Sequence, residues 1–364
     1  MLQADRRSYI ICVASLGHYR LRTIRYVKER MANELTIYSG TPAYDRYIKV
    51  LSSRDVDLRE MANVYGPYQV LFQRVPVRKI LAADNVIFDL NPRIPHVWIL
   101  MLIRKALRRP TTLWGHAFPR RGPSSASDAI RGLMRSMSDG LVTYTRSQAA
   151  ELAELHPVKD IYTAPNALYF RNEIGFSENT TRTDIIYVGR LESSKKVLDL
   201  LMAFELIAHH LPDYCRLVIV GEGNLRSTLD KMVSDSPLGR RIKLMGHIDI
   251  YESLKELYGR AFVSVSPGYV GLSITQSFAF GVPMIISRHE PHSPEIEAAV
   301  ENRNCVYFES DDVNALAQKI LSVWQDRRLW CSRGAEIAHF CADEYSVEAM
   351  GEGIIRALKR GNDS

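Results

Sequence analysis

The sequence predicts an α/β protein made of two doubly wound domains with parallel sheets. Short apolar runs alternate with helix-like segments along most of the chain. Several of these runs are apolar throughout, as are strands that are buried on both faces of a parallel sheet. The alternation stops once, near residues 169–183, and 364 residues are enough for two domains.

The first half contains six candidate strands, and the segments between them carry apolar residues at helical spacing. The strands are SYIICVA (8–14), ELTIYSG (34–40), NVIFDL (85–90), TTLWGH (111–116), GLVTYT (140–145) and IYTAPN (161–166). We expect residues 1–168 to form the first domain.

The polar stretch that follows, residues 169–183, has no sustained apolar period and is predicted to link the domains. The second half then supplies six more candidate strands, in a domain expected over residues 184–340. They are DIIYVG (184–189), RLVIVG (216–221), IKLMGH (242–247), FVSVS (262–266), PMIIS (283–287) and NCVYF (304–308). A cleft is expected between the domains, outside the carboxyl ends of both sheets.

Composition favours a cytoplasmic globular protein, with 46% hydrophobic and 24% charged residues. The apolar run VWILMLI (97–103) is too short to span a bilayer, which takes about 20 residues. The N-terminal residues lack the pattern of a signal peptide. The five cysteines are scattered and form no CxxC pair, so neither a disulfide framework nor a zinc site is indicated.

Positive charge is concentrated in the first half of the chain. Residues 1–170 hold 25 Lys/Arg and 14 Asp/Glu, a net charge of +11, whereas the remainder holds 22 and 27, a net charge of −5. A basic half suggests an anionic partner, and both nucleic acid and an anionic membrane surface qualify. The alternative is that these residues only solvate helix faces.

The stretch DIIYVGRLESSKKVLDL (184–200) predicts an anion site. A strand ends at Gly189, and a helix is expected to begin near Ser193 or Ser194, with Ser as the N-cap. Lys195 and Lys196 would then lie in the first helical turn, where the macrodipole makes cations unfavourable by about 0.3–1 kcal/mol each. A bound phosphate would make these two cations favourable instead, and Arg190 would contribute a further positive charge. The alternative is that both lysines extend into water.

The stretch SPGYVGLSITQSFAFGVP (266–283) predicts a second phosphate cradle in the same domain. A strand runs into a glycine loop and the loop into a helix, where Gly271 lets the backbone approach a ligand. Ser273 and Gln276 have the spacing of a capping box, which would give Gln276 a purely structural role. Two cradles at strand ends of one sheet suggest a diphosphate.

These motifs resemble retaining GT-B glycosyltransferases of family 4. The resemblance covers residues 184–309: the VGR-L-x-x-x-K element, IVGEGNLRSTL (219–229), IKLMGHI (242–248) and the glycine loop that ends in GVP (281–283). It implies transfer of a sugar from a nucleotide-diphosphate donor with retention and without a metal or other cofactor. Arg190 and Lys195 would neutralise the diphosphate, and the amides of Gly271, Leu272 and Ser273 would bind its oxygens. The base would lie near Gly246, His247 and Ile248.

The sequence departs from the family at two positions. The family has two glutamates separated by seven residues, and Gly268 and Gln276 stand in their places. Gln276 can still accept a hydrogen bond from a ribose hydroxyl through its carbonyl oxygen. Gly268 offers no side chain, so the contact to the donor sugar must come from elsewhere.

The same resemblance extends to the first half with weaker motifs. It places Gly17 at the donor phosphate or the acceptor, and HYR (18–20) suggests that His18, Tyr19 and Arg20 bind an acceptor in a bacterial surface-polysaccharide type. His116 would contact the reacting sugar; otherwise it is a hydrogen-bonded histidine at a strand end. The helix in residues 341–364 would cross back to the first domain.

A basic surface is also expected in the first domain, where it would suit an anionic membrane and a lipid-linked acceptor. Its residues are Arg74, Arg78, Lys79, Arg104, Lys105, Arg108, Arg109, Arg120 and Arg121. The enzyme would then work at the inner face of the plasma membrane.

The sequence therefore predicts a metal-independent transferase of a hexose or deoxyhexose that acts on a glycan or lipid-linked acceptor. The acceptor hydroxyl would attack from the front face, since no carboxylate nucleophile is evident. A sugar-nucleotide epimerase would need paired acid/base carboxylates, and a dinucleotide oxidoreductase would need a GxGxxG after the first strand. A non-catalytic partner that binds sugar nucleotide or lipid stays open. Nucleic acid is disfavoured, because the basic residues form no recognised reading motif.

Overall fold

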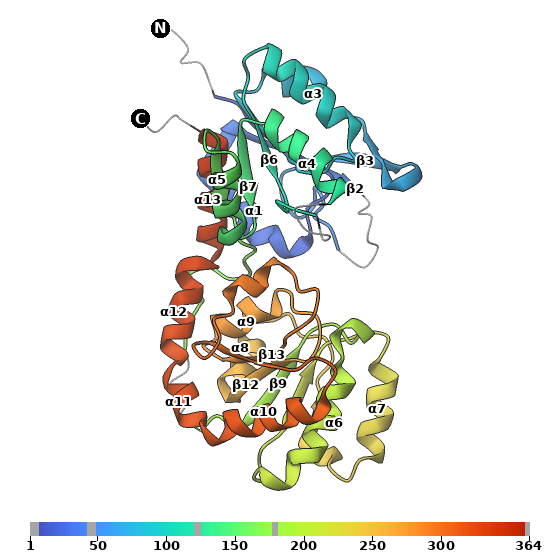
Figure 1. The fold of residues 1–364 in the computed structure, drawn as a ribbon, viewed down its shortest axis with the longest axis vertical. Coiled ribbons are helices and arrows are strands. Elements are labelled where there is room, and N and C mark those ends of the chain that lie inside the picture. The colour runs from blue at the N-terminus through green and yellow to red at the C-terminus, as the bar shows by residue number, and fades with distance from the viewer. Residues whose placement is uncertain (1–6, 42–48, 120–124, 177–180, 361–364) are drawn as a thin grey trace. The chain divides into compact units, whose positions relative to one another are not determined.

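Two compact units make up the chain in the computed structural model (Figure 1). Unit 1 comprises residues 1–168 and 347–364, and unit 2 comprises residues 169–346. Within them the structure describes residues 7–41, 49–119, 125–176 and 181–360. Both units are α/β with mainly parallel sheets, which confirms the predicted fold class.

Unit 1 contains one eight-stranded sheet with the order β4-β3-β2-β1-β5-β6-β7-β8. All neighbouring strands are parallel except the pair β3 and β4. The strands are β1 (Tyr9–Val13), β2 (Leu35–Thr41), β3 (Arg59–Tyr65), β4 (Leu71–Gln73), β5 (Asn85–Asp89), β6 (Thr111–Trp114), β7 (Gly140–Thr143) and β8 (Asp160–Thr163).

Two of these strands, β3 and β4, were not predicted. They lie at one edge of the sheet, and most residues of β3 are partly or fully exposed. An edge strand needs no continuous apolar run, so REMANVY carries no signal of burial on both faces.

Helices cover both faces of the unit 1 sheet. The helices are α1 (Leu21–Met31), α2 (Val77–Ala82), α3 (Pro95–Ala106), α4 (Ala126–Met137), α5 (Arg146–Leu155) and α13 (Val347–Lys359), with short 3₁₀ turns η1 (His18–Arg20), η2 (Ala32–Glu34) and η3 (Pro67–Gln69). Helices α2, α3, α4 and α5 share one core with alternate residues of the strands. Helix α13 contacts β5, β7 and β8, and α1 packs against α13.

The C-terminal helix α13 is anchored tightly in unit 1. The side-chain amide of Asn85 on β5 donates to the carbonyl oxygens of Ala357 and Leu358, at 2.8 and 3.1 Å, and so satisfies the end of α13. Gly353 lets α13 approach β8 closely, because a Cβ there would lie 2.0 Å from the carbonyl oxygen of Thr163.

Unit 2 contains a six-stranded parallel sheet with the order β11-β10-β9-β12-β13-β14. The strands are β9 (Asp184–Val188), β10 (Leu217–Val220), β11 (Ile242–Leu244), β12 (Ala261–Ser266), β13 (Met284–Ser287) and β14 (Cys305–Phe308). The helices are α6 (Val197–Ile207), α7 (Arg226–Asp235), α8 (Tyr251–Arg260), α9 (Ser273–Ala279), α10 (Val313–Gln325), α11 (Arg327–Ser332) and α12 (Gly334–Glu344), with 3₁₀ turns η4 (Ser193–Lys195), η5 (Ala208–His210), η6 (Gly239–Arg241) and η7 (Pro294–Ala298).

The strand order of unit 2 reverses between β9 and β12. The chain winds outward from β9 through β10 to β11, then returns to β12 on the other side of β9. The loops after β9 and β12 therefore leave the sheet in opposite directions, and a crevice opens at their carboxyl ends. The described part of residues 169–183 packs on this unit, since the Tyr251 hydroxyl donates to the carbonyl oxygen of Glu173 and the Gly175 N–H to that of Ala279.

We predict that Gly353→Ala lowers the free energy of unfolding by about 1–3 kcal/mol, because the added methyl group collides with backbone that cannot move aside. Urea denaturation of the full chain measures the change. Gly132→Ala on α4 is the matched control, since its Cβ would meet only the Arg135 guanidinium at 3.4 Å. The control is expected to stabilise the chain by about 0.5–1 kcal/mol. Equal effects of the two variants would contradict the tight packing of α13.

Candidate functional site

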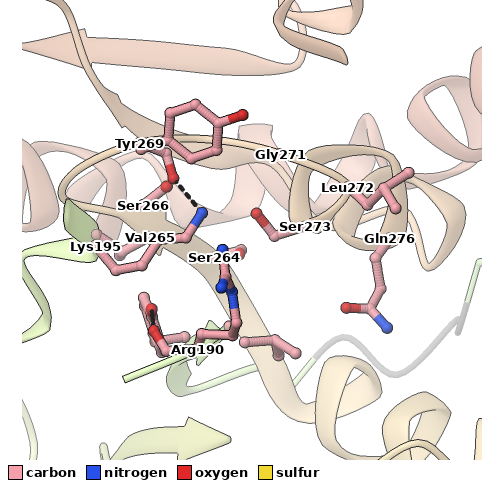
Figure 2. A pocket seen from close by; sticks show the side chains of 13 residues that line it. Arg190, Lys195, Ser264, Val265, Ser266, Tyr269, Gly271, Leu272, Ser273 and Gln276 are labelled. Atoms are coloured by element: carbon pink, nitrogen blue, oxygen red, sulfur yellow. Dashed lines mark hydrogen bonds between the residues drawn. The ribbon is translucent and has the colours of Figure 1, made fainter. Parts of the chain in front are cut away.

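A pocket of about 200 Å³ opens at the switch point between β9 and β12 (Figure 2). None of the residues that line it carries a carboxylate. The lining residues are Tyr187, Val188, Gly189, Arg190, Lys195, Ser264, Val265, Ser266, Tyr269, Gly271, Leu272, Ser273 and Gln276. Of the residues predicted for the donor, the pocket brings together Arg190, Lys195, Gly271, Leu272, Ser273 and Gln276.

Lys195 places a largely buried ammonium group in this pocket. Its Nζ donates to the carbonyl oxygen of Tyr269 at 2.7 Å and lies 4.3 Å from the centre of the Tyr269 ring. Among the described residues, no carboxylate lies within 4.0 Å of this Nζ. Desolvation and the nearby Arg190 charge lower the pKa of Lys195 to about 8. A buried cation with only neutral partners is a site for an anionic ligand.

Arg190 lies at the mouth of the same pocket. Its Nη1 donates to Oε1 of Glu192 at 2.9 Å, and the arginine side chain is 52% exposed. An exposed ion pair of this kind contributes little to stability. The guanidinium also keeps donors that the pair does not use, so it can bind a phosphate with or without Glu192.

Lys196 has a different role from Lys195, which corrects the predicted helix start. The residue adopts a left-handed conformation with φ 49°, and helix α6 begins after it, at Val197. Its Nζ pairs with Glu290 at 2.5 Å and with Asp311 at 2.6 Å. Lys195 lies in the 3₁₀ turn η4, and the Ser193 side chain forms no cap. The dipole argument therefore fails, and burial rather than the helix dipole makes the Lys195 charge costly.

The turn η4, which contains Lys195 and is called the lysine turn below, packs directly on the glycine loop between β12 and α9. The Tyr269 N–H donates to the carbonyl oxygen of Ser194 at 3.0 Å, and a Cβ on Gly268 would lie 2.5 Å from that same oxygen. A side chain at position 268 is thus excluded in this arrangement. The close approach of the two loops therefore leaves no room at this position for the glutamate that the family has.

His292 and Ser293 hold the loop from its other side. The Val270 N–H donates to Nδ1 of His292 at 3.0 Å, and Nε2 lies 2.8 Å from the Ser287 carbonyl oxygen. The Ser293 N–H and hydroxyl both donate to the Val270 carbonyl oxygen at 3.0 Å. The histidine must therefore be neutral, and burial lowers its pKa accordingly.

Gln276 does not form the predicted capping box. Helix α9 begins at Ser273 with Leu272 as the N-cap, and no side chain caps it. Instead the Gln276 Nε2 donates to the Tyr169 hydroxyl at 3.0 Å. Tyr169 is buried and edge-on to Tyr251 and Phe280, so the amide is held from behind. The Gln276 side chain extends into the pocket, with its carbonyl oxygen available as an acceptor (Figure 2).

Three residues predicted to contact the base are absent from the pocket lining: Gly246, His247 and Ile248. They follow β11, the edge strand two places from β9. Gly246 has φ 72°, its carbonyl oxygen accepts from the Gly221 N–H at 2.8 Å, and the His247 side chain is 70% exposed. They lie beside the crevice rather than at its floor.

Four predicted residues of unit 1 gather at the carboxyl end of β1. Gly17 precedes the turn η1, which contains His18, Tyr19 and Arg20. His18 lies 4.0 Å from Asp55 and is partly exposed. Arg20 is buried: its Nε donates to the Asn166 side chain at 3.2 Å, and its guanidinium stacks on rings. The rings are those of Tyr19, Trp114 and Tyr144.

His116 lies at the carboxyl end of β6 in the same unit. Its side chain is exposed, and its ring lies edge-on to Tyr144 at 5.0 Å. In the described residues, no group of three or more His, Cys, Asp or Glu side chains is placed to hold a metal ion. Near His18, Asp55 accepts a hydrogen bond from the Ser52 hydroxyl, and Asp57 accepts one from Lys28 Nζ.

Sequence reasoning missed three contributors: Tyr187, Tyr269 and His292. Tyr187 interrupts an otherwise aliphatic strand, and its hydroxyl donates to the carbonyl oxygen of Arg190 at 2.8 Å. Burial raises its pKa. A tyrosine inside such a strand, directly before VGR, is a signal that could have been used. His292 lies 22 residues from its partner Val270, so no local pattern marks it.

Comparison with known proteins agrees with this geometry. Residues 171–336 match the family described as "Glycosyl transferases group 1". A poly(ribitol-phosphate) α-N-acetylglucosaminyltransferase of Staphylococcus aureus is 21% identical over 214 residues, covering 59% of this chain and 42% of that protein. An α-1,4-N-acetyl-D-galactosaminyltransferase of Campylobacter jejuni, which acts on a diphospho-undecaprenol-linked glycan, is 28% identical over 173 residues, covering 46% of each chain. This chain thus spans about half the length of these curated relatives.

Solved structures share the fold over the whole chain. Anabaena Alr3699/HepE in complex with UDP superposes with a TM-score of 0.69 at 12% identity, covering 97% of this chain and 99% of that one. The lipopolysaccharide outer core galactosyltransferase WaaB superposes with a TM-score of 0.64 at 10% identity, covering 97% and 99%.

If Lys195 binds a diphosphate, as the sequence predicts, we predict that the affinity for UDP falls as the pH rises through about 8, because only the protonated lysine attracts the phosphates. Below that pH the ammonium is charged and affinity is expected to be constant. Calorimetric titrations between pH 7 and 9.5, in buffers of different ionisation enthalpy, should show proton uptake on binding above pH 8. A flat affinity without proton uptake would contradict the assignment.

We predict that His292→Leu lowers the free energy of unfolding at pH 7 by about 1–3 kcal/mol, since it leaves the Val270 N–H unpaired. The folded pKa of His292 lies below its unfolded value of about 6.5. The stabilisation is therefore full above that value and is lost as the pH falls through the folded pKa, so the difference from wild type should shrink in acid.

Denaturation curves at several pH values test this prediction. The matched control is His289→Leu, because the His289 side chain is 64% exposed and its ring pairs with the exposed Glu309. Its effect is expected within about 0.5 kcal/mol. If the His292 variant were as stable as this control at pH 7, the hydrogen bond from Val270 to His292 would not stabilise the glycine loop.

Proposed function

We propose that this chain, whose residues 171–336 belong to the glycosyl transferases group 1 family and whose fold is GT-B, is a retaining glycosyltransferase that uses a nucleotide-diphosphate sugar. The observation that supports this most strongly is the buried ammonium of Lys195, which faces a pocket without carboxylates. Arg190 and the backbone of Gly271, Leu272 and Ser273 border the same pocket.

In this proposal Arg190 and Lys195 stabilise the charge that develops on the departing diphosphate. Their positions are set before the ligand arrives, by the Tyr269 carbonyl oxygen and by Glu192. Gln276, fixed by Tyr169, accepts a hydrogen bond from a ribose hydroxyl. Because no carboxylate lines the pocket among the described residues, we assign no covalent sugar–enzyme intermediate; the acceptor hydroxyl attacks from the face that the diphosphate leaves and gives its proton to the departing diphosphate.

The proposed donor is a uridine diphosphate sugar. Structures of the fold neighbour from Anabaena hold UDP, UDP with glucose, or UDP-glucose. Gly268 leaves no side chain to hold the sugar, so the specificity for a particular hexose or deoxyhexose would differ from that of members with a glutamate there. A sugar-nucleotide epimerase is disfavoured, since it needs acid/base carboxylates that the described lining lacks.

The proposed acceptor is a glycan or lipid-linked oligosaccharide of a bacterial surface polysaccharide. Two of the curated relatives act on a poly(ribitol phosphate) and on an undecaprenol-linked glycan. We assign acceptor contact to His18 and Tyr19, and contact with the reacting sugar to His116. Arg20 is buried beneath the rings and positions them.

We also propose that the chain works peripherally at the inner face of the plasma membrane, where such an acceptor is held. The net charge of +11 in residues 1–170 supports an anionic surface as partner. None of the helices in the described residues has the length and apolarity that crossing a bilayer requires.

We predict that Lys195→Met reduces kcat/KM for sugar transfer roughly 100-fold or more, because removing one preorganised donor to a developing anion costs that much. Initial rates with a radiolabelled UDP-sugar and membrane extract, or hydrolysis of the donor without acceptor, provide the measurement.

The adjacent lysine offers a matched control. Lys196→Asn removes a cation that pairs with Glu290 and Asp311, and Asn tolerates the left-handed backbone. Its kcat/KM is expected within about threefold of wild type. Activity of Lys195→Met near wild type would refute the diphosphate assignment. Tight UDP binding by wild type without transfer or hydrolysis of any donor would favour a non-catalytic partner protein.

A further inference from the structure

Helix α3 is apolar on both its packed and its outer side. Val97, Leu100 and Met101 enter the core of unit 1. The opposite side presents four large aliphatic residues, and most helices that are apolar all round are fully buried. The exposed fractions are 58% for Ile99, 57% for Leu102, 39% for Ile103 and 54% for Leu107 just beyond the helix.

The neighbouring helices extend this surface. Helix α3 contacts both α2 and α4, and all three pack on the same side of the unit 1 sheet. Figure 1 shows α3 and α4 together in the outer layer of the unit. On α4, Ile130 and Leu133 are 56% and 57% exposed, and Val77 on α2 is 45% exposed. We call these seven aliphatic residues the α3 face. Apolar surface of this extent marks an interaction site.

The exposed charges on the helices of the α3 face have one sign. Helices α2 and α3 contain no acidic residue, and the single carboxylate of α4, Asp128, is buried in a two-pronged pair with Arg135. The exposed charged residues on these helices and the turn after α3 are all cationic: Arg78, Lys79, Lys105 and Arg108.

The structure also corrects the basic surface predicted from sequence. Arg104 is fully buried, and its guanidinium donates to the carbonyl oxygens of Ile80, Ala83 and Pro110. Arg109 pairs with Asp84 at 2.9 Å. Arg104 is therefore not available to a partner in this arrangement, and the charge of the half-exposed Arg109 is partly balanced by Asp84. Arg120 and Arg121 lie outside the described residues.

We propose that the α3 face docks on the surface of an anionic lipid bilayer, with its aliphatic side chains in the headgroup region and its cations on the lipid phosphates. Exposed aliphatic residues beside exposed cations, without a competing carboxylate, match the two parts of such a surface. A second copy of this chain fits poorly, because a two-fold contact would bring Lys105 and Arg108 of both copies together.

The inference deepens the proposed membrane partner and depends on the proposed function only for its biological purpose. Docking needs neither the donor pocket nor a sugar acceptor, so vesicle binding and UDP binding can fail independently. Each is therefore measured on every variant.

The test is flotation of the full chain with vesicles of phosphatidylcholine alone or with 30% phosphatidylglycerol. Wild type should float with the anionic vesicles and less with the neutral ones. The double variant Leu102→Gln/Leu133→Gln should lose affinity roughly tenfold or more, because two aliphatic side chains no longer leave water. Lys105→Gln/Arg108→Gln should weaken binding and reduce its dependence on salt.

The control is Leu206→Gln on α6 of unit 2, an equally polar change at a leucine that is 48% exposed. It should bind vesicles as wild type does, and all variants should keep the wild-type melting temperature and UDP affinity. The proposal is overturned if wild type does not bind anionic vesicles, or if the control loses as much affinity for them as the Leu102/Leu133 double variant does. It is also overturned if that double variant instead abolishes self-association in sedimentation experiments, which would make the face a dimer contact.

Discussion

The site in unit 2 depends on one constraint: the ammonium of Lys195 is largely buried, and among the described residues no carboxylate lies within 4.0 Å of it. Its partners are the Tyr269 carbonyl oxygen and ring, both neutral, and Arg190 nearby adds repulsion. The free-energy cost of burying such a charge falls when an anion binds beside it. The described residues that line the pocket carry no carboxylate, and in the proposed site a carboxylate beside Lys195 would compete with the ligand.

The surrounding structure keeps Lys195 in place through backbone contacts. The glycine loop is held on one side by Ser194 of the lysine turn and on the other by neutral His292 and by Ser293. The close approach of Ser194 to Gly268 takes the space from which a side chain would start. Replacement of a family glutamate is therefore coupled to the position of the lysine turn. The absence of a side chain at Gly268 goes together with the close packing of the lysine turn and the glycine loop.

Much of this could be predicted from the sequence, and the rest depends on contacts that no local pattern encodes. Strands that are buried on both faces appear in the sequence as continuous apolar runs, so all six strands of unit 2 were predicted. The strands β3 and β4 at the sheet edge were missed because they are largely exposed and carry no such run. Arg190, Lys195 and the glycine loop follow strand ends, which meet at one edge of a sheet. The different partners of Lys195 and Lys196 could not be predicted, because Lys196 pairs with Glu290 and Asp311, which lie about a hundred residues away. The capping box at Ser273 failed for a similar reason: Tyr169, distant in sequence, binds Gln276.

The most direct test of this account is the affinity of wild type and Lys195→Met for uridine, UMP and UDP, measured by calorimetry at pH 7. In the proposed site the ammonium lies against the phosphates of the diphosphate, so the variant should lose affinity for UDP and keep that for uridine nearly unchanged. The gain in affinity from UMP to UDP should be large in wild type and mostly absent from the variant. An equal loss for all three ligands would show that Lys195 shapes the pocket without binding the diphosphate, and would contradict the central claim.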